Sequence, residues 1–161
     1  MLSLERILDF RFSALMVACI LAVSGAHAAT LNIVGGQLAG ASGVDVEGSV
    51  FDVQFPDGTC AEIFGGCEAL SDFDFVTLPD AQSASQALLD QVFLDVEGGA
   101  FDASPELTSG CSFLTWCIVL TPYSRINLGV SALAAQNLSP NVVGGDSTES
   151  WAINDSFDTA V

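Results

Sequence analysis

Positive charge is almost missing from this sequence. Its 161 residues include three Lys or Arg and one His against 20 Asp or Glu, which gives a net charge of −17. Binding to nucleic acid requires many cations that neutralise phosphates, and an anionic membrane surface repels an acidic protein. The composition therefore excludes both of these partners. Half of the residues are apolar, and 11 residues are Phe, so the chain can still bury the core of one domain.

Long hydrophobic runs are also missing, apart from one near the N-terminus. Arg6 and Arg11 flank a short leader, residues 12–23 are almost entirely apolar, and Ala26-His27-Ala28 follows. This order is typical of a secretory signal peptide that is cleaved after Ala28. A membrane-spanning helix needs about 20 apolar residues, more than the twelve in this run. A lipoprotein cleavage box ending at Cys19 is disfavoured because the apolar run continues past it. We expect residues 1–28 to be removed and residues 29–161 to form one exported domain without a membrane span.

Removal of this leader would leave residues 29–161 without any His or Lys, with one cation, Arg125, and with 18 acidic residues. The Ser–His–Asp and Cys–His nucleophile systems need an imidazole, and the common catalytic zinc sites need His ligands. Phosphate-binding loops and Schiff-base enzymes need a Lys. The mature chain is therefore expected to be non-catalytic and to hold no cofactor and no metal.

The acidic residues suggest two other functions, a calcium site or a two-carboxylate glycosidase. The closest clusters are Asp45 with Glu47 and Asp72 with Asp74, and strand alternation would place both acids of each pair on one exposed face. Neither cluster matches a calcium loop, which alternates acids around a central Gly and ends in a Glu. We expect a solvated surface that keeps the protein soluble. Hydrolysis of carbohydrate by two carboxylates is the enzymatic alternative.

Two local patterns predict the first elements of the fold. Residues 44–46 and 50–55 flank the short connection Glu47-Gly48-Ser49, and the second segment alternates apolar and polar residues, which predicts a β-hairpin. A helix is predicted from the N-cap Thr77, with Pro79 in its first turn and Gly98-Gly99 as its stop. Its apolar residues recur every three or four positions and are expected to pack in the core. They are Ala81, Ala84, Leu88, Leu89, Val92, Phe93 and Val96.

The C-terminal third is predicted to form strands. Residues 111–123 carry apolar side chains on both faces, as a central strand does. Residues 126–138 alternate more regularly, and Trp151, Ile153 and Phe157 predict a last strand. The expected fold class is α+β: a mostly antiparallel β-sheet with one amphipathic helix packed on a face, and two short-range disulfides.

The disulfides are expected among the cysteines of residues 29–161, which are Cys60, Cys67, Cys111 and Cys117. An exported protein meets an oxidising compartment, so this even number predicts two disulfides, for which three pairings exist. Short spacing favours Cys60–Cys67 and Cys111–Cys117, while a longer-range pairing between the hairpin region and the later strands stays open. The second local pair requires a turn near Leu114-Thr115, because a straight strand would hold its ends about 20 Å apart. A zinc site is disfavoured because neither spacing matches a zinc knuckle and no His is present.

Three segments stand out in the middle of the chain: residues 43–53 (GVDVEGSVFDV), 57–60 (DGTC) and 84–93 (ASQALLDQVF). They resemble exported bacterial proteins with a PEP-CTERM sorting domain, and the similarity extends over residues 40–117, about half of the chain. The resemblance implies export in a Gram-negative bacterium and association with extracellular polysaccharide or the cell surface, through an ectodomain without an assigned activity. Such proteins end in Pro-Glu-Pro, an apolar span and a basic cluster, whereas this sequence ends in Asp158-Thr159-Ala160-Val161. We expect either a truncated sequence or a secreted relative without the sorting tail.

Together these observations favour a secreted, non-catalytic protein that is extracellular or associated with the cell surface or matrix. The alternative is a carbohydrate-active protein, either a small binding module or a carboxylate-based enzyme. Its candidate residues for ligand stacking are Trp116, Tyr123 and Trp151, because aromatic rings stack on sugar rings, and burial in the core is the competing interpretation. Exposure distinguishes the two, since aromatic rings on an open sheet face would favour sugar binding.

Overall fold

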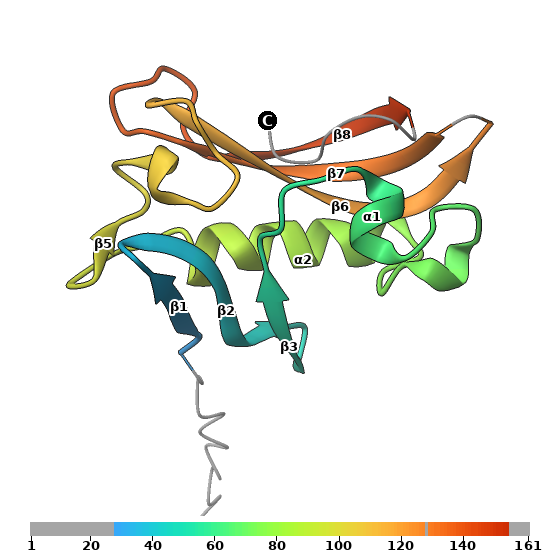
Figure 1. The fold of residues 1–161 in the computed structure, drawn as a ribbon, viewed down its shortest axis with the longest axis horizontal. Coiled ribbons are helices and arrows are strands. Elements are labelled where there is room, and N and C mark those ends of the chain that lie inside the picture. The colour runs from blue at the N-terminus through green and yellow to red at the C-terminus, as the bar shows by residue number, and fades with distance from the viewer. Residues whose placement is uncertain (1–27, 128, 155–161) are drawn as a thin grey trace, which may run out of the picture.

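Two three-stranded antiparallel sheets lie on either side of a helix (Figure 1). The computed structural model describes residues 28–127 and 129–154. The first sheet contains β1 (Thr30–Val34), β2 (Gln37–Val46) and β3 (Ser49–Gln54) in that order, and the second contains β6 (Trp116–Ile126), β7 (Gly129–Leu138) and β8 (Ser147–Asn154). Helix α2 (Leu78–Gln91) lies between them. The shorter elements are α1 (Cys60–Phe64), β4 (Asp95–Val96), β5 (Gly99–Ala100) and the 3₁₀ helices η1 (Leu70–Asp72) and η2 (Pro105–Leu107). The predicted α+β class is confirmed, although the strands form two larger sheets rather than one.

Two-residue turns connect the strands of the first sheet. Gly35 and Gly36 join β1 to β2, and Glu47 and Gly48 join β2 to β3. All four residues have positive φ angles, from 52° at Glu47 to 88° at Gly36. Positive φ at both central residues is the turn geometry that matches the twist of the strands, and it favours glycine. The predicted hairpin is confirmed.

Helix α2 has the predicted N-cap and the predicted buried face. The Thr77 side chain accepts a hydrogen bond from Asp80 N at 3.3 Å, and Pro79 lies in the first turn. The apolar stripe packs in the core, where Leu88 is 4% exposed. Ser85 is fully buried, and its Oγ donates to Leu133 O at 3.3 Å. Apolar packing and this hydrogen bond therefore attach the helix to the second sheet.

The helix ends earlier than the sequence predicts. Its last residue is Gln91, and its predicted stop, Gly98-Gly99, lies instead at the β4–β5 hairpin. The side chain of Gln91 donates to Asp45 O at 2.7 Å and accepts from Asp45 N at 3.0 Å, which anchors the helix end to β2. Phe93 lies beyond the helix but stays buried and stacks on Phe55, with ring centroids 5.6 Å apart. The end of the predicted stripe, Val96, is 42% exposed.

The central strand of the second sheet is β7, so the prediction of a central strand over residues 111–123 is wrong. β6 begins only at Trp116 and lies at the sheet edge, because the order is β6-β7-β8. β7 is buried on both faces. Helix α2 packs on one face, and a second group of apolar residues, described below as the outer cluster, covers the other. β8 confirms the predicted last strand through Trp151 and Ile153. Phe157, which the sequence pattern places in the same strand, lies outside the described residues.

Both disulfides have the short-range pairing that the spacing favours. Cys60 and Cys67 are bonded with their Cα atoms 6.1 Å apart, and Cys111 and Cys117 with theirs 5.5 Å apart. The second pair is possible because residues 114–115 form the predicted turn directly before β6. A straight strand could not bring those two Cα atoms together.

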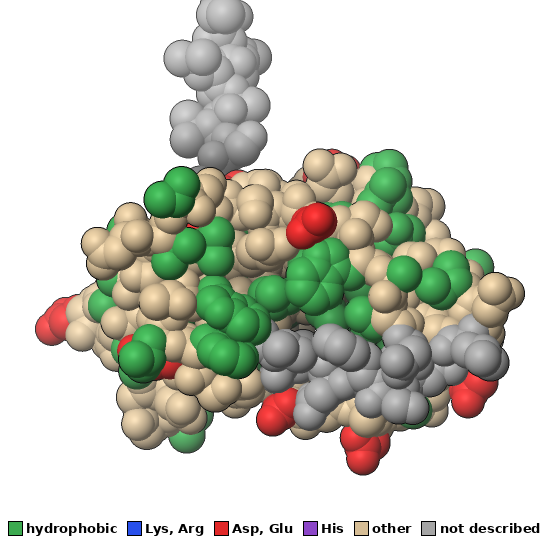
Figure 2. Space-filling view, turned by 90° about the horizontal axis from the view of Figure 1, so that it is seen from above, with side chains coloured by type: hydrophobic (Ala, Val, Ile, Leu, Met, Phe, Trp, Pro, Cys, Tyr) green, Lys and Arg blue, Asp and Glu red, His purple; other side chains and the backbone are tan. Residues whose placement is uncertain are grey.

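The core consists of two hydrophobic clusters. The inner cluster fills the space between the first sheet, α2 and the near face of the second sheet. The outer cluster covers the far face of the second sheet, where Ile118, Leu120 and Ala134 meet the Cys60–Cys67 disulfide and Phe73. Seen from this side, apolar side chains gather over the middle of the face (Figure 2). In the described part of the chain, no helix is long and apolar enough to cross a membrane.

Candidate functional site

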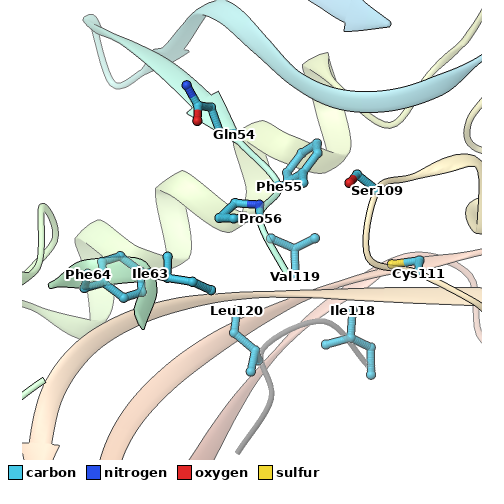
Figure 3. A pocket seen from close by; sticks show the side chains of 10 residues that line it. All are labelled: Gln54, Phe55, Pro56, Ile63, Phe64, Ser109, Cys111, Ile118, Val119 and Leu120. Atoms are coloured by element: carbon cyan, nitrogen blue, oxygen red, sulfur yellow. The ribbon is translucent and has the colours of Figure 1, made fainter. Parts of the chain in front are cut away.

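A groove runs along the free edge of β6, between this strand, the segment that leaves β3, and α1 (Figure 3). Its inner part has a volume of about 70 Å³ and its outer part a volume of about 350 Å³. Ser109 and Cys111 line the inner part, whereas Asp52 and Asp74 line the outer part. The side chains that line both parts are mostly apolar: Gln54, Phe55, Pro56, Ile63, Phe64, Val119 and Leu120.

Helix α1 forms one wall of the groove and was not predicted from the sequence. Thr59 is its N-cap, and Glu62 Oε2 accepts hydrogen bonds from Thr59 N at 2.9 Å and from Thr59 Oγ1 at 2.8 Å. The disulfide from Cys60 to Cys67 closes the loop that follows the helix. A sequence signal for this element did exist, because Thr59-Cys60-Ala61-Glu62 has the spacing of a capping box.

The strand register shows which backbone groups of β6 face the groove. Ser139 N donates to Thr115 O at 3.0 Å, so this opposed pair is hydrogen-bonded. Bonded and non-bonded pairs alternate along an antiparallel ladder. The backbone groups of residues 117, 119 and 121 therefore bond to β7. The backbone groups of residues 116, 118, 120 and 122 point away from β7, toward the free edge. Pro122 has no N–H group, so it leaves no donor unpaired at this position of an edge strand.

Two of these outward N–H groups, on Ile118 and Leu120, have no backbone partner among the described residues. Ile118 and Leu120 are each 9% exposed, and no backbone hydrogen bond from the described residues reaches their N–H groups. Their side chains lie on the far side of β6, whereas Val119 points toward Phe55 and Pro56 (Figure 3). An unpaired N–H group on an edge strand is available to a further hydrogen-bond acceptor. The arrangement therefore suits an apolar ligand group that carries a hydrogen-bond acceptor.

The three aromatic residues that the sequence marked for ligand stacking do not form one platform. Trp116 and Trp151 lie on the outer face of the second sheet, but the register separates them by six positions along the strands, or about 20 Å. Tyr123 is directed to the opposite face, where its hydroxyl lies 3.0 Å from Ser150 Oγ. All three rings are half-buried. The rings of Trp116 and Phe113 stack, with their centroids 4.1 Å apart and the planes inclined by 14°.

The acidic pair Asp45 and Glu47, singled out in the sequence, supports local structure. Asp45 Oδ1 accepts from Gly48 N at 2.6 Å in the β2–β3 turn, and Glu47 Oε1 accepts from Ser83 Oγ of α2 at 2.6 Å. Asp72 lies in η1 rather than in a strand, so the strand alternation predicted for Asp72 and Asp74 is wrong. Among the described residues, no three His, Cys, Asp or Glu side chains are close enough together to hold a metal ion.

A different acidic cluster lies beside the loops that precede β6 and follow β7. Burial raises the pKa of Asp102, and the nearby carboxylates of Asp146 and Asp95 raise the same pKa further. Asp95 Oδ1 also accepts hydrogen bonds from the backbone of Asp102 and Ala103, both at 3.0 Å. The sequence did not indicate this cluster, because its three members are distant along the chain and meet only through the packing of the loops.

Comparison with known proteins adds no assignment to this geometry. No protein-family model matches the sequence, and neither the curated proteins nor the solved structures include a match to the chain.

Proposed function

We propose that this chain is an exported, non-catalytic binding protein that works outside the cell or at its surface, with the groove along β6 as its ligand site. The observation that carries the proposal is the groove itself. It combines apolar walls with two N–H groups, on Ile118 and Leu120, that point away from β7 and have no backbone partner in the described residues. Such a site gains binding energy from apolar contact and selects ligands that bring a hydrogen-bond acceptor.

The residue types near the groove support binding rather than chemistry. Residues 29–161 contain no His and no Lys, so imidazole bases and amine nucleophiles are missing from this part of the chain. At the outer part, Asp52 Oδ1 accepts a hydrogen bond from Gly43 N at 3.1 Å and so has a structural role in β2 and β3.

Two disulfides support the extracellular part of the proposal, because such bonds form and persist in oxidising compartments. The N-terminal leader pattern and the resemblance to PEP-CTERM proteins are in agreement with export.

The resemblance also makes extracellular polysaccharide a partner to test. Affinity electrophoresis in gels that contain a soluble polysaccharide would show retarded migration if the protein binds it, and unchanged migration would remove this partner from the proposal.

A neutral apolar fluorophore that carries a carbonyl acceptor, 6-propionyl-2-(dimethylamino)naphthalene, tests the groove directly. We expect saturable fluorescence enhancement with the native protein and a loss of affinity of at least about tenfold in Ile63→Trp, because the larger ring fills the groove. The matched control is Val50→Trp, since Val50 is 63% exposed on β3 and does not line the groove. No saturable binding to the native protein, or equal loss in both variants, would contradict the proposed site.

Peptide mapping of the exported protein under non-reducing conditions tests the compartment. We expect two cross-linked peptides, Cys60–Cys67 and Cys111–Cys117, and no free thiol in residues 29–161. Four free thiols in protein recovered from outside the cell would contradict the extracellular part of the proposal, whatever the fluorophore shows.

A further inference from the structure

A rigid apolar surface lies at the end of the second sheet where β6 begins. The loop that leads into β6 and the loop between β7 and β8 lie together at this end (Figure 1). They expose Phe113 by 46%, Leu114 by 73% and Val143 by 100%, and Trp116 is half-buried beside them. We call these four residues the loop-end surface. Single exposed apolar residues are normal, but exposed apolar side chains on two neighbouring loops indicate an interaction site.

Both loops are fixed in place by bonds that do not involve the exposed side chains. The Cys111–Cys117 disulfide closes the loop that carries Phe113 and Leu114. Ser139 N donates to Thr115 O at 3.0 Å, which joins the two loops. Asp146 Oδ1 then accepts from Leu138 N at 2.7 Å and so holds the second loop against the end of β7. A surface that is already ordered loses less entropy on binding than a flexible loop would.

The charge around this surface is negative. Asp146 is part of the second loop, and it acts electrostatically on Asp102, which is also close to Asp95. Arg125, the single Lys or Arg in residues 29–161, lies near the other end of β6, opposite Gly129–Val130 at the start of β7. A ligand that covers the loop-end surface therefore meets exposed apolar groups flanked by carboxylates.

We propose that the loop-end surface docks a basic, hydrophobic peptide segment of another protein. The apolar side chains of such a segment would cover Phe113, Leu114 and Val143, while its cations would lie near Asp102 and Asp146. A second copy of this chain fits less well, because it would bring the same negative charges to the interface. This inference concerns a surface separate from the groove along β6, so it does not depend on the proposed function of that groove.

The test uses fluorescently labelled model peptides and measures their binding to the disulfide-intact protein by anisotropy. The probe is a short peptide of alternating leucine and lysine. One control peptide alternates leucine and glutamate, and the other alternates serine and lysine. The salt concentration is about 0.15 M, at which charges more than about 8 Å apart are largely screened. We expect the leucine–lysine peptide to bind and both control peptides to bind at least about tenfold more weakly, because docking needs apolar contact and charge together.

Variants locate the binding. Phe113→Ser and Leu114→Ser are expected to weaken the leucine–lysine peptide by at least about tenfold each, as exposed anchors of an interface do. Both residues are exposed, so the fold should persist, and an unchanged circular dichroism spectrum would verify this. The matched control is Val50→Ser, which removes an apolar side chain of similar exposure from β3 and should leave binding unchanged.

Several results would overturn the inference. Equal binding of the serine–lysine peptide would show attraction by charge alone. Equal weakening by Val50→Ser would show that the loop end is not the binding surface. Tight binding to phosphatidylcholine vesicles in place of the peptide, lost in Leu114→Ser, would assign the surface to a membrane. A Leu114-dependent dimer seen by sedimentation would assign it to a second copy of the chain.

Discussion

Replacing Leu88 with Ala tests whether α2 is the packing centre of the fold. Leu88 is 4% exposed and belongs to the inner cluster between the two sheets. The change removes three buried carbon atoms, which costs about 2.4 kcal/mol at about 0.8 kcal/mol per group. A sealed cavity would add to this cost, but Leu88 also lines the outer part of the groove, which has about 350 Å³ of space. The void therefore opens into the groove, and we expect a loss of about 2–3 kcal/mol, in the lower half of the range for buried leucines.

Urea unfolding followed by circular dichroism, with the disulfides intact, measures this free energy if the m-value is unchanged. The control is Leu78→Ala, the same substitution in the first turn of the same helix, where the side chain is 43% exposed. It should change the free energy of unfolding by no more than about 0.5 kcal/mol. A loss below about 1 kcal/mol at Leu88, or equal losses at both positions, would refute the packing of α2 between two sheets.

Three further predictions concern other parts of the chain. Because the folded protein raises the pKa of Asp102, this carboxyl stabilises the fold at low pH and loses that contribution as the pH rises. Asp102→Asn should therefore raise the free energy of unfolding at neutral pH. It should bring no gain below the ordinary carboxyl pKa, and urea unfolding measured at a series of pH values checks both outcomes. Ser85→Ala should cost about 1 kcal/mol, because Leu133 O loses a buried hydrogen bond, whereas Ser83→Ala removes a solvent-exposed hydrogen bond to Glu47 and should cost less. N-terminal sequencing of the exported protein should begin at Ala29, and a start before His27 would restore a histidine to the mature chain.

The features that the sequence predicted correctly depend on local rules. Thr77 marks the start of α2 because its side chain can cap only a nearby N–H group. The turn at residues 114–115 follows from covalent geometry, since a disulfide between Cys111 and Cys117 cannot span a straight strand. The helix end at Gln91 could not be predicted in this way, because its anchor is the backbone of Asp45, 46 residues away. The apolar spacing continues through Phe93, because this side chain is buried although it lies beyond the helix. The spacing alone therefore does not show where the helix ends.

The candidate site depended on long-range pairing and was therefore not visible in the sequence. Residues on both faces of β6 are apolar, so the pattern predicted a central strand, although the strand lies at an edge. Its second apolar face is explained by α1 and the Cys60–Cys67 disulfide, which pack on the outer cluster. The groove exists because β6 has a free edge beside α1. The alternation of apolar and polar residues along a strand shows which face is buried, but it does not show which edge pairs with another strand.

The position of α2 has a consequence for the order of folding. One side of the helix is covered by strands that precede it in the chain, and the other side by strands that follow it. The hydrogen bond from Ser85 to Leu133 joins residues 48 positions apart. Contacts of this length form slowly, because much of the chain must be ordered before they are made. During synthesis, which begins at the N-terminus, the chain therefore cannot cover both sides of α2 until β7 has also been made.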